Sequence, residues 1–172
     1  MNFFKKYYSF DSYPIKVDFV KLTHLEPSQQ EQFIKQAGLW ATKNWQYIFP
    51  TITDWEADVR KFQENFYFAI YAGQPVGMFA LKVLDEYQAF RRPLMVQTLF
   101  YVYVDERVRS LSVGKQITKE AERIAREQGM DMVVLQTTKP SLNSFYQKNG
   151  YRCVCDSQFY GQTVSNLMLS LS

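Results

Sequence analysis

The sequence is poor in the residues on which disulfide scaffolds and metal centres depend. Its 172 residues include only two cysteines, Cys153 and Cys155, and a single histidine, His24. This set does not supply a convincing zinc site, so we expect no metal. On a strand, the two cysteines would share a face without being placed to bond to each other. We expect reduced packing residues, as in cytoplasmic proteins. We also expect His24 to be packed; a catalytic Cys–His pair is an alternative that nothing local supports.

The chain also lacks long apolar runs and a strong charge of either sign. No apolar segment approaches the length of a membrane span, and Lys5 and Lys6 are not followed by the apolar region of a signal peptide. The net charge of +3 at pH 7 is too small to indicate nucleic-acid binding. We therefore expect a cytoplasmic protein with no membrane and no nucleic-acid partner. A mild positive charge still favours an anionic ligand.

The composition that is present suits one globular domain. Hydrophobic residues make up 47% of the sequence, charged residues 22% and aromatic residues 17%. We see no linker, repeat or low-complexity segment, and we expect one domain over residues 16–172. An aromatic-rich extension, residues 1–15, precedes it. For this extension, packing on the domain's own surface is favoured over a partner-binding arm.

Hydrophobic periodicity predicts an alternation of strands and helices. Strands are predicted at residues 16–25, 66–72, 76–84, 96–104, 132–136, 151–155 and 163–171. Helices are predicted at residues 28–38, 54–64, 114–128 and 140–149, with Ser28 as the cap of the first and Gly38 near its end. The strand–helix–strand units imply parallel neighbours near the middle of a mixed sheet. The predicted fold class is therefore α/β (α+β).

Small and basic residues mark the junction between the fourth strand and the third helix. The stretch VRSLSVGKQI, residues 108–117, combines two arginine or lysine positions with serines and a glycine. A helix that opens on a tight turn exposes unpaired N–H groups, and its dipole is positive there. Such a place binds anions, phosphates above all. An ordinary loop with a serine cap is the alternative that this stretch alone leaves open.

Two motifs carry a resemblance to a known family. Residues 109–114, RSLSVG, resemble an acyl-CoA turn of pattern Gln/Arg-x-x-Gly-x-Gly/Ala, which follows an apolar triplet, here VYV at 102–104. Residues 145–151, FYQKNGY, match a second pattern, Phe-Tyr-x-Lys-x-Gly-Phe/Tyr. With both motifs in the expected order, the chain resembles the GCN5-related N-acetyltransferase (GNAT) superfamily over about residues 16–171. The resemblance implies a twisted, mostly antiparallel mixed sheet with a parallel central pair, flanked by about four helices.

The resemblance also implies a co-substrate and a reaction. Acetyl-CoA is the implied co-substrate, and its acetyl group passes to a primary amine of a small molecule or peptide by direct attack in a ternary complex. Tyr146 is the implied catalytic residue and faces the sulfur. The implied cofactor-binding residues come from the triplet, the turn and the fourth helix: Val102, Tyr103, Val104, Arg109, Ser110, Leu111, Ser112, Val113, Gly114, Lys115 and Asn143. A homodimer is left open.

Two positions depart from the family pattern. Ser112 stands where the family usually has the first glycine, and its Cβ restricts the backbone angles. Lys139 stands where an asparagine commonly helps to hold the cofactor; Asn143, one turn before Tyr146, is the candidate substitute. These departures leave open a protein of another class, a non-catalytic acyl-CoA-binding or sensor module on the same fold.

The sequence offers no evident general base. The fourth predicted strand contains no carboxylate, although many members of the resembled family carry a glutamate there. Asp85 and Glu86 in the preceding loop are candidates, and Gln97 or Thr98 could orient a water. Deprotonation at pH 7 costs about 4.6 kcal/mol for a lysine-like amine but only about 1 kcal/mol for an α-amine. We therefore expect a small amine or a peptide α-amine to be preferred over a lysine ε-amine.

Aromatic residues after the first predicted helix are candidates for the acceptor pocket, which the resemblance places near the first helices. They are Trp40, Trp45, Tyr47, Phe49 and Trp55. Aromatic faces suit an apolar or cationic acceptor. For most of these residues, ordinary core packing is the favoured interpretation.

Overall fold

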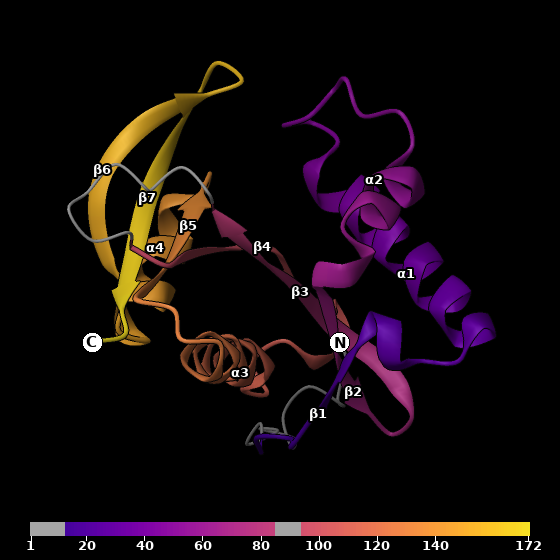
Figure 1. The fold of residues 1–172 in the computed structure, drawn as a ribbon. Helices are drawn as coiled ribbons and strands as arrows, with labels where there is room; N and C mark the ends of the chain where they lie inside the picture. Colours follow the sequence, from indigo (N-terminus) through magenta and orange to yellow (C-terminus); the bar gives the residue numbers. More distant parts are fainter. Residues whose placement is uncertain (1–12, 85–93) are drawn as a thin grey trace, which may run out of the picture.

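The computed structural model describes residues 13–84 and 94–172, whose strands form one seven-stranded sheet (Figure 1). The strands are β1 (Asp18–Lys21), β2 (Phe66–Tyr71), β3 (Gln74–Leu84), β4 (Val96–Val104), β5 (Met132–Thr137), β6 (Arg152–Phe159) and β7 (Gln162–Ser170). Their order is β1-β2-β3-β4-β5-β7-β6, with β4 and β5 parallel and the other pairs antiparallel. The predicted fold class and the parallel central pair are confirmed. Asp85, Glu86 and most of the predicted extension lie outside the described residues.

The described helices are α1 (Pro27–Trp45), α2 (Trp55–Lys61), α3 (Val113–Glu127) and α4 (Pro140–Lys148). In the two described ranges, no helix has the length and apolar character needed to cross a membrane. Two expectations about α1 are wrong: Glu26 rather than Ser28 is its N-cap residue, and the helix continues past Gly38. Gly38 serves packing, because a Cβ there would lie 2.8 Å from Cγ of Glu56 on α2.

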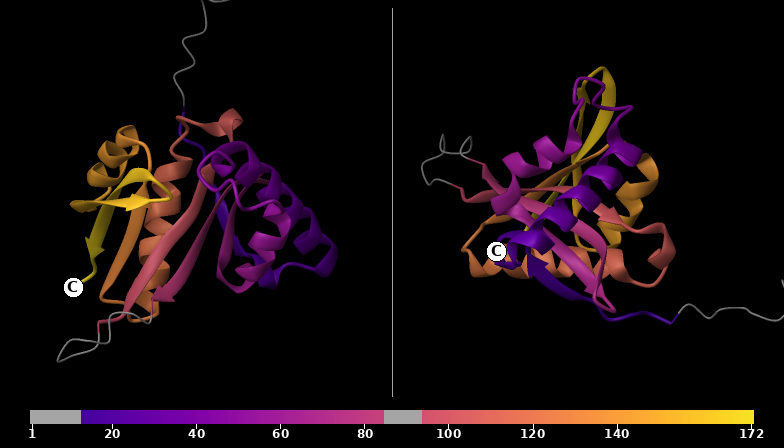
Figure 2. Two further views of the ribbon diagram at one scale, coloured as in Figure 1. Left: turned by 90° about the horizontal axis from the view of Figure 1, so that it is seen from above. Right: turned by 90° about the vertical axis from the view of Figure 1, so that its right-hand side faces the viewer.

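Strand β3 connects two hydrophobic cores, one on each face of the sheet. Phe79 of β3 packs in a cluster with Ile117 of α3, whereas its neighbour Met78 packs in a second cluster with Ile34 of α1. Successive side chains of a strand point to opposite faces, so helices must cover both. Figure 2 shows this arrangement, with α1 and α2 on one side of the sheet and α3 on the other.

A bulge in β4 opens the centre of the sheet. The register between β3 and β4 shifts so that two β4 residues, Tyr101 and Val102, stand opposite Phe79. Tyr101 has a φ of 55°, in the left-handed region that residues other than glycine rarely adopt. Strands β4 and β5 pair only where residues 96–98 face residues 132–134. Beyond this point the two strands are not paired, and their carboxyl ends are left apart.

Strand β6 is an edge strand, and this position corrects the expectation for the cysteines. It pairs only with β7, and nearly its whole length is exposed. Cys153 and Cys155 are free and exposed, so they are not packing residues. His24 is also exposed, at the end of a short 3₁₀ helix (Leu22–His24) before α1, and the expectation of a packed histidine is wrong.

Gly77 of β3 leaves the room that β4 and α3 need to approach each other. A Cβ at this position would lie 2.9 Å from the Tyr103 carbonyl oxygen and 3.1 Å from Cδ1 of Ile117. We expect Gly77→Ala to lower the free energy of unfolding by about 2–3 kcal/mol, because overpacking forces backbone shifts. Urea unfolding measures this change.

Gly73→Ala is the control, since a Cβ at Gly73 meets nothing within 4 Å. Its cost of about 1 kcal/mol comes only from the left-handed backbone, with φ of 74°. A Gly77→Ala variant that loses no more stability than Gly73→Ala would contradict the packing argument.

Candidate functional site

The turn before α3 has the backbone geometry of an anion-binding nest. Ser110 and Ser112 both have a φ of 66°, with Leu111 between them outside the left-handed region. Alternation of this kind turns successive N–H groups toward one concavity. Ser112 is also the N-cap residue of α3, but its side chain makes no capping hydrogen bond. The first N–H groups of the helix therefore have no cap from this serine, and the helix dipole adds positive potential.

Gln116 fastens this turn to the segment before β1. Its Oε1 accepts a hydrogen bond from the Val17 N–H at 3.1 Å, and its Nε2 donates to the Ile15 carbonyl at 2.7 Å. The same Nε2 lies 3.2 Å from Oγ of Ser112, which accepts. The Ile15 N–H donates to the Leu111 carbonyl at 3.2 Å. These bonds hold the left-handed serines in place, and the Ser112 hydroxyl keeps its own proton to donate.

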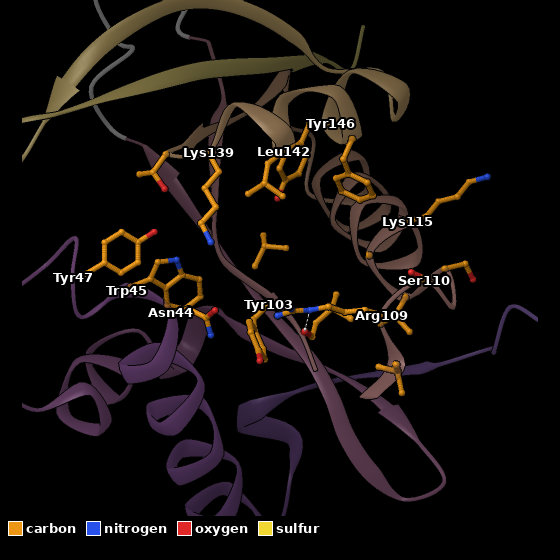
Figure 3. Close-up of a pocket in the computed structure, with 18 residues that line it drawn as sticks. Asn44, Trp45, Tyr47, Tyr103, Arg109, Ser110, Lys115, Lys139, Leu142 and Tyr146 are labelled. Atoms are coloured by element: carbon orange, nitrogen blue, oxygen red, sulfur yellow. Dashed lines mark hydrogen bonds between the residues drawn. The ribbon is translucent and has the colours of Figure 1, made fainter. Parts of the chain in front are cut away.

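The turn lies beside a cleft of about 540 Å³ at the open end of β4 and β5 (Figure 3). Most residues implied to bind a cofactor line it: Val102, Tyr103, Val104, Arg109, Ser110, Ser112, Val113, Gly114 and Lys115. Tyr146 of α4 also lines the cleft. Within the described part of the chain, Leu111 and Asn143 do not belong to its lining. The structure thus brings together all but two of the residues that the motifs singled out.

Asn143 is bound to protein groups and is not turned into the cleft lining. Its Oδ1 accepts a hydrogen bond from the Thr137 hydroxyl, and its Nδ2 donates to the Ser165 hydroxyl at 2.9 Å. Ser165 in turn donates to Asp156 at 2.9 Å. Both ends of the amide therefore join α4 to β5 and β7, and the idea that Asn143 substitutes for the family asparagine gains no support. Lys139 itself, by contrast, lines the cleft.

Three cationic side chains lie around the cleft, and their partners differ. The Arg109 Nε donates to the Val104 carbonyl at 3.2 Å, and its guanidinium lies 5.5 Å from the centre of the Tyr103 ring. A ligand that pairs with this carbonyl must displace Arg109. Lys115 and Lys139 form no ion pair within the described residues, and Figure 3 shows Lys139 extending into the cleft. They are the cations available to an anion.

Tyr146 is a buried phenol whose hydroxyl has no hydrogen-bond partner within the described residues. Its side chain is 6% exposed, and its ring contacts Phe145 and Tyr151 edge-on, with centroids 5.1 and 5.6 Å away. Burial raises the pKa of Tyr146 above its usual value. The hydroxyl therefore stays protonated at neutral pH and can donate a hydrogen bond. Phe145 also packs close to Gly114, where a Cβ would lie 3.2 Å from Cζ of its ring.

A second cavity of about 460 Å³ adjoins the first, since Trp45, Val102 and Tyr146 line both. Of the aromatic residues proposed for an acceptor pocket, Phe49 and Trp55 line only this cavity. Tyr47 lines only the first, whereas Trp40 is buried in the core against Tyr103, with ring centroids 5.1 Å apart.

Sequence reasoning missed Asp58, the one carboxylate in the described lining of this second cavity. Asp58 lies on α2, whose N-cap residue is Asp54: the Asp54 side chain accepts from the Ala57 N–H at 3.0 Å. Trp55, Asp58 and Phe62 all line the cavity, and their spacing of three and four residues places them on one helix face. That spacing was the available signal, but a polar residue on such a face also fits solvent exposure.

Comparison with known proteins agrees with this architecture. Residues 62–153, just over half of the chain, match the family model described as an acetyltransferase (GNAT) domain. No curated protein sequence matches the chain significantly.

Solved structures share the fold over nearly all of the chain. A GNAT acetyltransferase from Staphylococcus aureus Mu50 is 18% identical, with 91% of this chain and all of that chain covered and a TM-score of 0.65. A Bacillus subtilis acetyltransferase in complex with CoA is 18% identical, with 91% and 100% covered and a TM-score of 0.63. A chain of the NatC complex bound to Gag peptide and CoA is 13% identical, with 92% and 100% covered and a TM-score of 0.68. At such low identities these likenesses show the fold alone.

The strained backbone at Ser112 generates a prediction about stability. A left-handed residue other than glycine costs about 1 kcal/mol or more, so Ser112→Gly removes strain while losing the contact between Oγ and Gln116. We expect its free energy of unfolding to equal that of the native protein or to exceed it by up to about 1 kcal/mol. Thermal or urea unfolding provides the measurement.

Ser144→Gly is the matched control, because Ser144 is an exposed residue inside α4. There the same change is expected to cost about 0.5 kcal/mol, since glycine is a poor helix former. If Ser112→Gly proves at least as destabilising as Ser144→Gly, the strain argument is wrong.

Proposed function

The chain belongs to the GNAT acetyltransferase family, and from that premise we propose that it is an acetyl-CoA-dependent N-acetyltransferase. The proposed acceptor is a primary amine of a small molecule or a peptide, which attacks directly in a ternary complex. One observation carries the proposal: the turn at residues 109–115, the unpaired part of β4 and the Tyr146 phenol all meet in one cleft. These are the three parts that binding an acyl thioester and releasing its thiol require.

In this proposal the α3 turn holds the anionic end of acetyl-CoA. The N–H groups from Ser110 to Lys115 bind the pyrophosphate, where the nest and the helix dipole act together. Lys115 and Lys139, which have no ion-pair partner among the described residues, add positive charge. The backbone at residues 102–104 pairs with the pantetheine arm as an added strand, after Arg109 leaves the Val104 carbonyl.

Tyr146 assists departure of the thiolate. The nitrogen lone pair forms the new N–C bond as the C–S bond breaks; the nitrogen releases a proton to water, and the sulfur takes one up. With ordinary pKa values of about 10 and 8.5, full proton transfer from tyrosine to thiolate is uphill by roughly 2 kcal/mol. Burial raises the pKa of Tyr146 further, which makes that transfer harder. Tyr146 therefore acts first as a hydrogen-bond donor to the developing charge, and in this proposal the backbone N–H near Val102 polarises the carbonyl.

The deprotonation cost sets the acceptor preference. The described part of β4 contains no carboxylate that could act as a base. A lysine-like amine pays about 4.6 kcal/mol to lose its proton at pH 7, and an α-amine pays about 1 kcal/mol. Between amines that bind equally well, the one of lower pKa is accordingly the better acceptor in this proposal.

Charge reversal in α3 tests the binding of CoA. Lys115→Glu places a negative charge in the lining of the cleft, at the end of the helix where the dipole favours anions. We expect this change to weaken CoA binding by about 10-fold or more, which corresponds to roughly 1.4 kcal/mol of electrostatic interaction in a partly screened site. Calorimetric titration with CoA at low and high salt measures the effect.

Lys119→Glu is the control one turn along the same helix, outside the cleft and 3.8 Å from Glu122. It should alter the dissociation constant by no more than about 2-fold, because exposed charges at this distance are screened. Equal weakening by both variants would remove the turn from the binding site. Tight CoA binding without turnover of any amine would favour the non-catalytic acyl-CoA-binding module.

Removal of one hydroxyl tests the role of Tyr146. Tyr146→Phe keeps the ring contacts, and CoA should still bind. We expect kcat to fall by about 10- to 100-fold, which corresponds to the loss of one hydrogen bond to a developing charge. Tyr151→Phe is the control, since among the described residues the buried Tyr151 hydroxyl has no hydrogen-bond partner, and Tyr151 lines neither cavity. That change should leave kcat unaltered. An unchanged kcat in Tyr146→Phe, with chemistry limiting turnover, would make Tyr146 structural.

A further inference from the structure

Aromatic side chains from three distant segments enclose the second cavity. Phe49, in the loop between α1 and α2, packs edge-on against Trp55 with ring centroids 6.0 Å apart. Its ring also meets Phe159 and Tyr160 at the β6–β7 turn, with centroids 5.5 and 5.4 Å away. Gln46 fixes the loop, because it accepts from the Trp55 indole N–H at 2.6 Å. The walls therefore offer apolar and π surface to whatever binds between them.

One acidic side chain is the only charged group in the described lining of this cavity. Within the described lining, Asp58 is the only acidic residue, and no lysine, arginine or histidine is present. The Asp58 side chain is 14% exposed, and Lys61, 3.4 Å away, is a largely exposed partner whose attraction is screened by water. A carboxylate can accept about four hydrogen bonds. Asp58 thus has capacity for a further donor on the cavity side.

Tyr101 holds this carboxylate in place. Its hydroxyl donates to Oδ2 of Asp58, and its ring packs against Trp45 with centroids 5.3 Å apart. Burial, together with the hydrogen bond and charge of Asp58, raises the pKa of Tyr101 above its usual value. The phenol therefore remains a donor at neutral pH, and Asp58 remains the acceptor of the pair. A fixed, negatively charged oxygen in an aromatic cavity is complementary to an ammonium group.

The two cavities share part of their walls beside the place where the acyl group is proposed to lie. Trp45, Val102 and Tyr146 line both of them. An amine that enters the second cavity therefore faces the strand opening and the phenol without leaving protein walls. This continuity makes the second cavity the acceptor side of the cleft.

We propose, on the basis of the proposed N-acetyltransferase function, that this cavity selects compact apolar monoamines, alkylamines with or without an aromatic ring and without a carboxylate, whose ammonium group Asp58 binds. An acceptor with its own carboxylate is disfavoured, because the described lining holds no cation to compensate its burial. A diamine is disfavoured, because its second ammonium would lose water and meet no second carboxylate. An apolar body gains by burial against the aromatic walls.

Direct binding tests the anchor separately from catalysis. Calorimetry with 2-phenylethylamine, on the free and the CoA-saturated protein, is compared with the uncharged 2-phenylethanol. Asp58→Asn keeps an acceptor for the Tyr101 hydroxyl but removes the charge, and it should weaken amine binding by about 10-fold or more. Binding of the alcohol should change by no more than about 2-fold. Asp54→Asn is the control on the same helix, since asparagine caps as well as aspartate and Asp54 lies outside the cavity.

Turnover tests the selectivity. We expect kcat/KM for 2-phenylethylamine to exceed those for L-phenylalanine and 1,6-diaminohexane. Asp58→Asn should act mainly on KM, while retained CoA binding and an unchanged melting temperature show that the variant is folded.

Each outcome separates this proposal from the proposed function. Amine binding that depends on Asp58, without acetyl transfer to any amine, would support the role of Asp58 and refute the proposed N-acetyltransferase function. Transfer that favours the amino acid or the diamine would overturn the selectivity, while the proposed N-acetyltransferase function would remain. Equal weakening of amine and alcohol by Asp58→Asn, or no weakening of the amine, would show that Asp58 is structural and also overturn the proposal.

Discussion

The left-handed backbone of Tyr101 is the constraint on which the site depends. A strand residue with φ of 55° costs about 1–2 kcal/mol, and it persists only where its surroundings compensate. Here the Tyr101 hydroxyl donates to Asp58, and its ring packs against Phe66 with centroids 5.1 Å apart. The bulge turns β4 away from β5, which is why these strands pair only at their start. Both cavities border the opening that results, and the side chain that anchors the bulge also fixes the carboxylate of the second cavity.

The cationic, neutral and acidic groups along this opening follow the order that the proposed reaction requires. At one end, the nest before α3 and the side chains of Lys115 and Lys139 favour anions. In the middle, Tyr146 is a buried neutral donor. At the other end, aromatic walls surround the carboxylate of Asp58. An anionic thioester and a cationic amine would therefore approach from opposite ends and meet at the phenol, with little competition for the same positions.

The sequence predicted the parts of the site that depend on local backbone chemistry. The turn and its serines stand where a strand gives way to a helix, and the motif around Tyr146 lies on the predicted fourth helix, because both patterns are read within a few residues. Asp58 was missed, and the contacts of Asn143 were not foreseen, because both depend on distant parts of the fold: Asp58 reaches Tyr101, and Asn143 reaches Ser165. The bulge could not be predicted from the sequence either, since nothing in a β-rich run indicates that a tyrosine will adopt a left-handed backbone. The end of α1 was wrongly predicted near Gly38 for a similar reason, because glycine is common both at helix ends and where two helices pack closely.

We propose that CoA occupies the opening between β4 and β5 with its phosphates on the α3 turn. Amide hydrogen exchange with and without CoA measures this at the level of segments. If CoA binds there, amide exchange should slow at residues 102–104 and 110–115. Exchange should change little in β1 and β2, which lie at one edge of the sheet. Protection confined to other segments, or none at residues 110–115 under saturating CoA, would contradict the account.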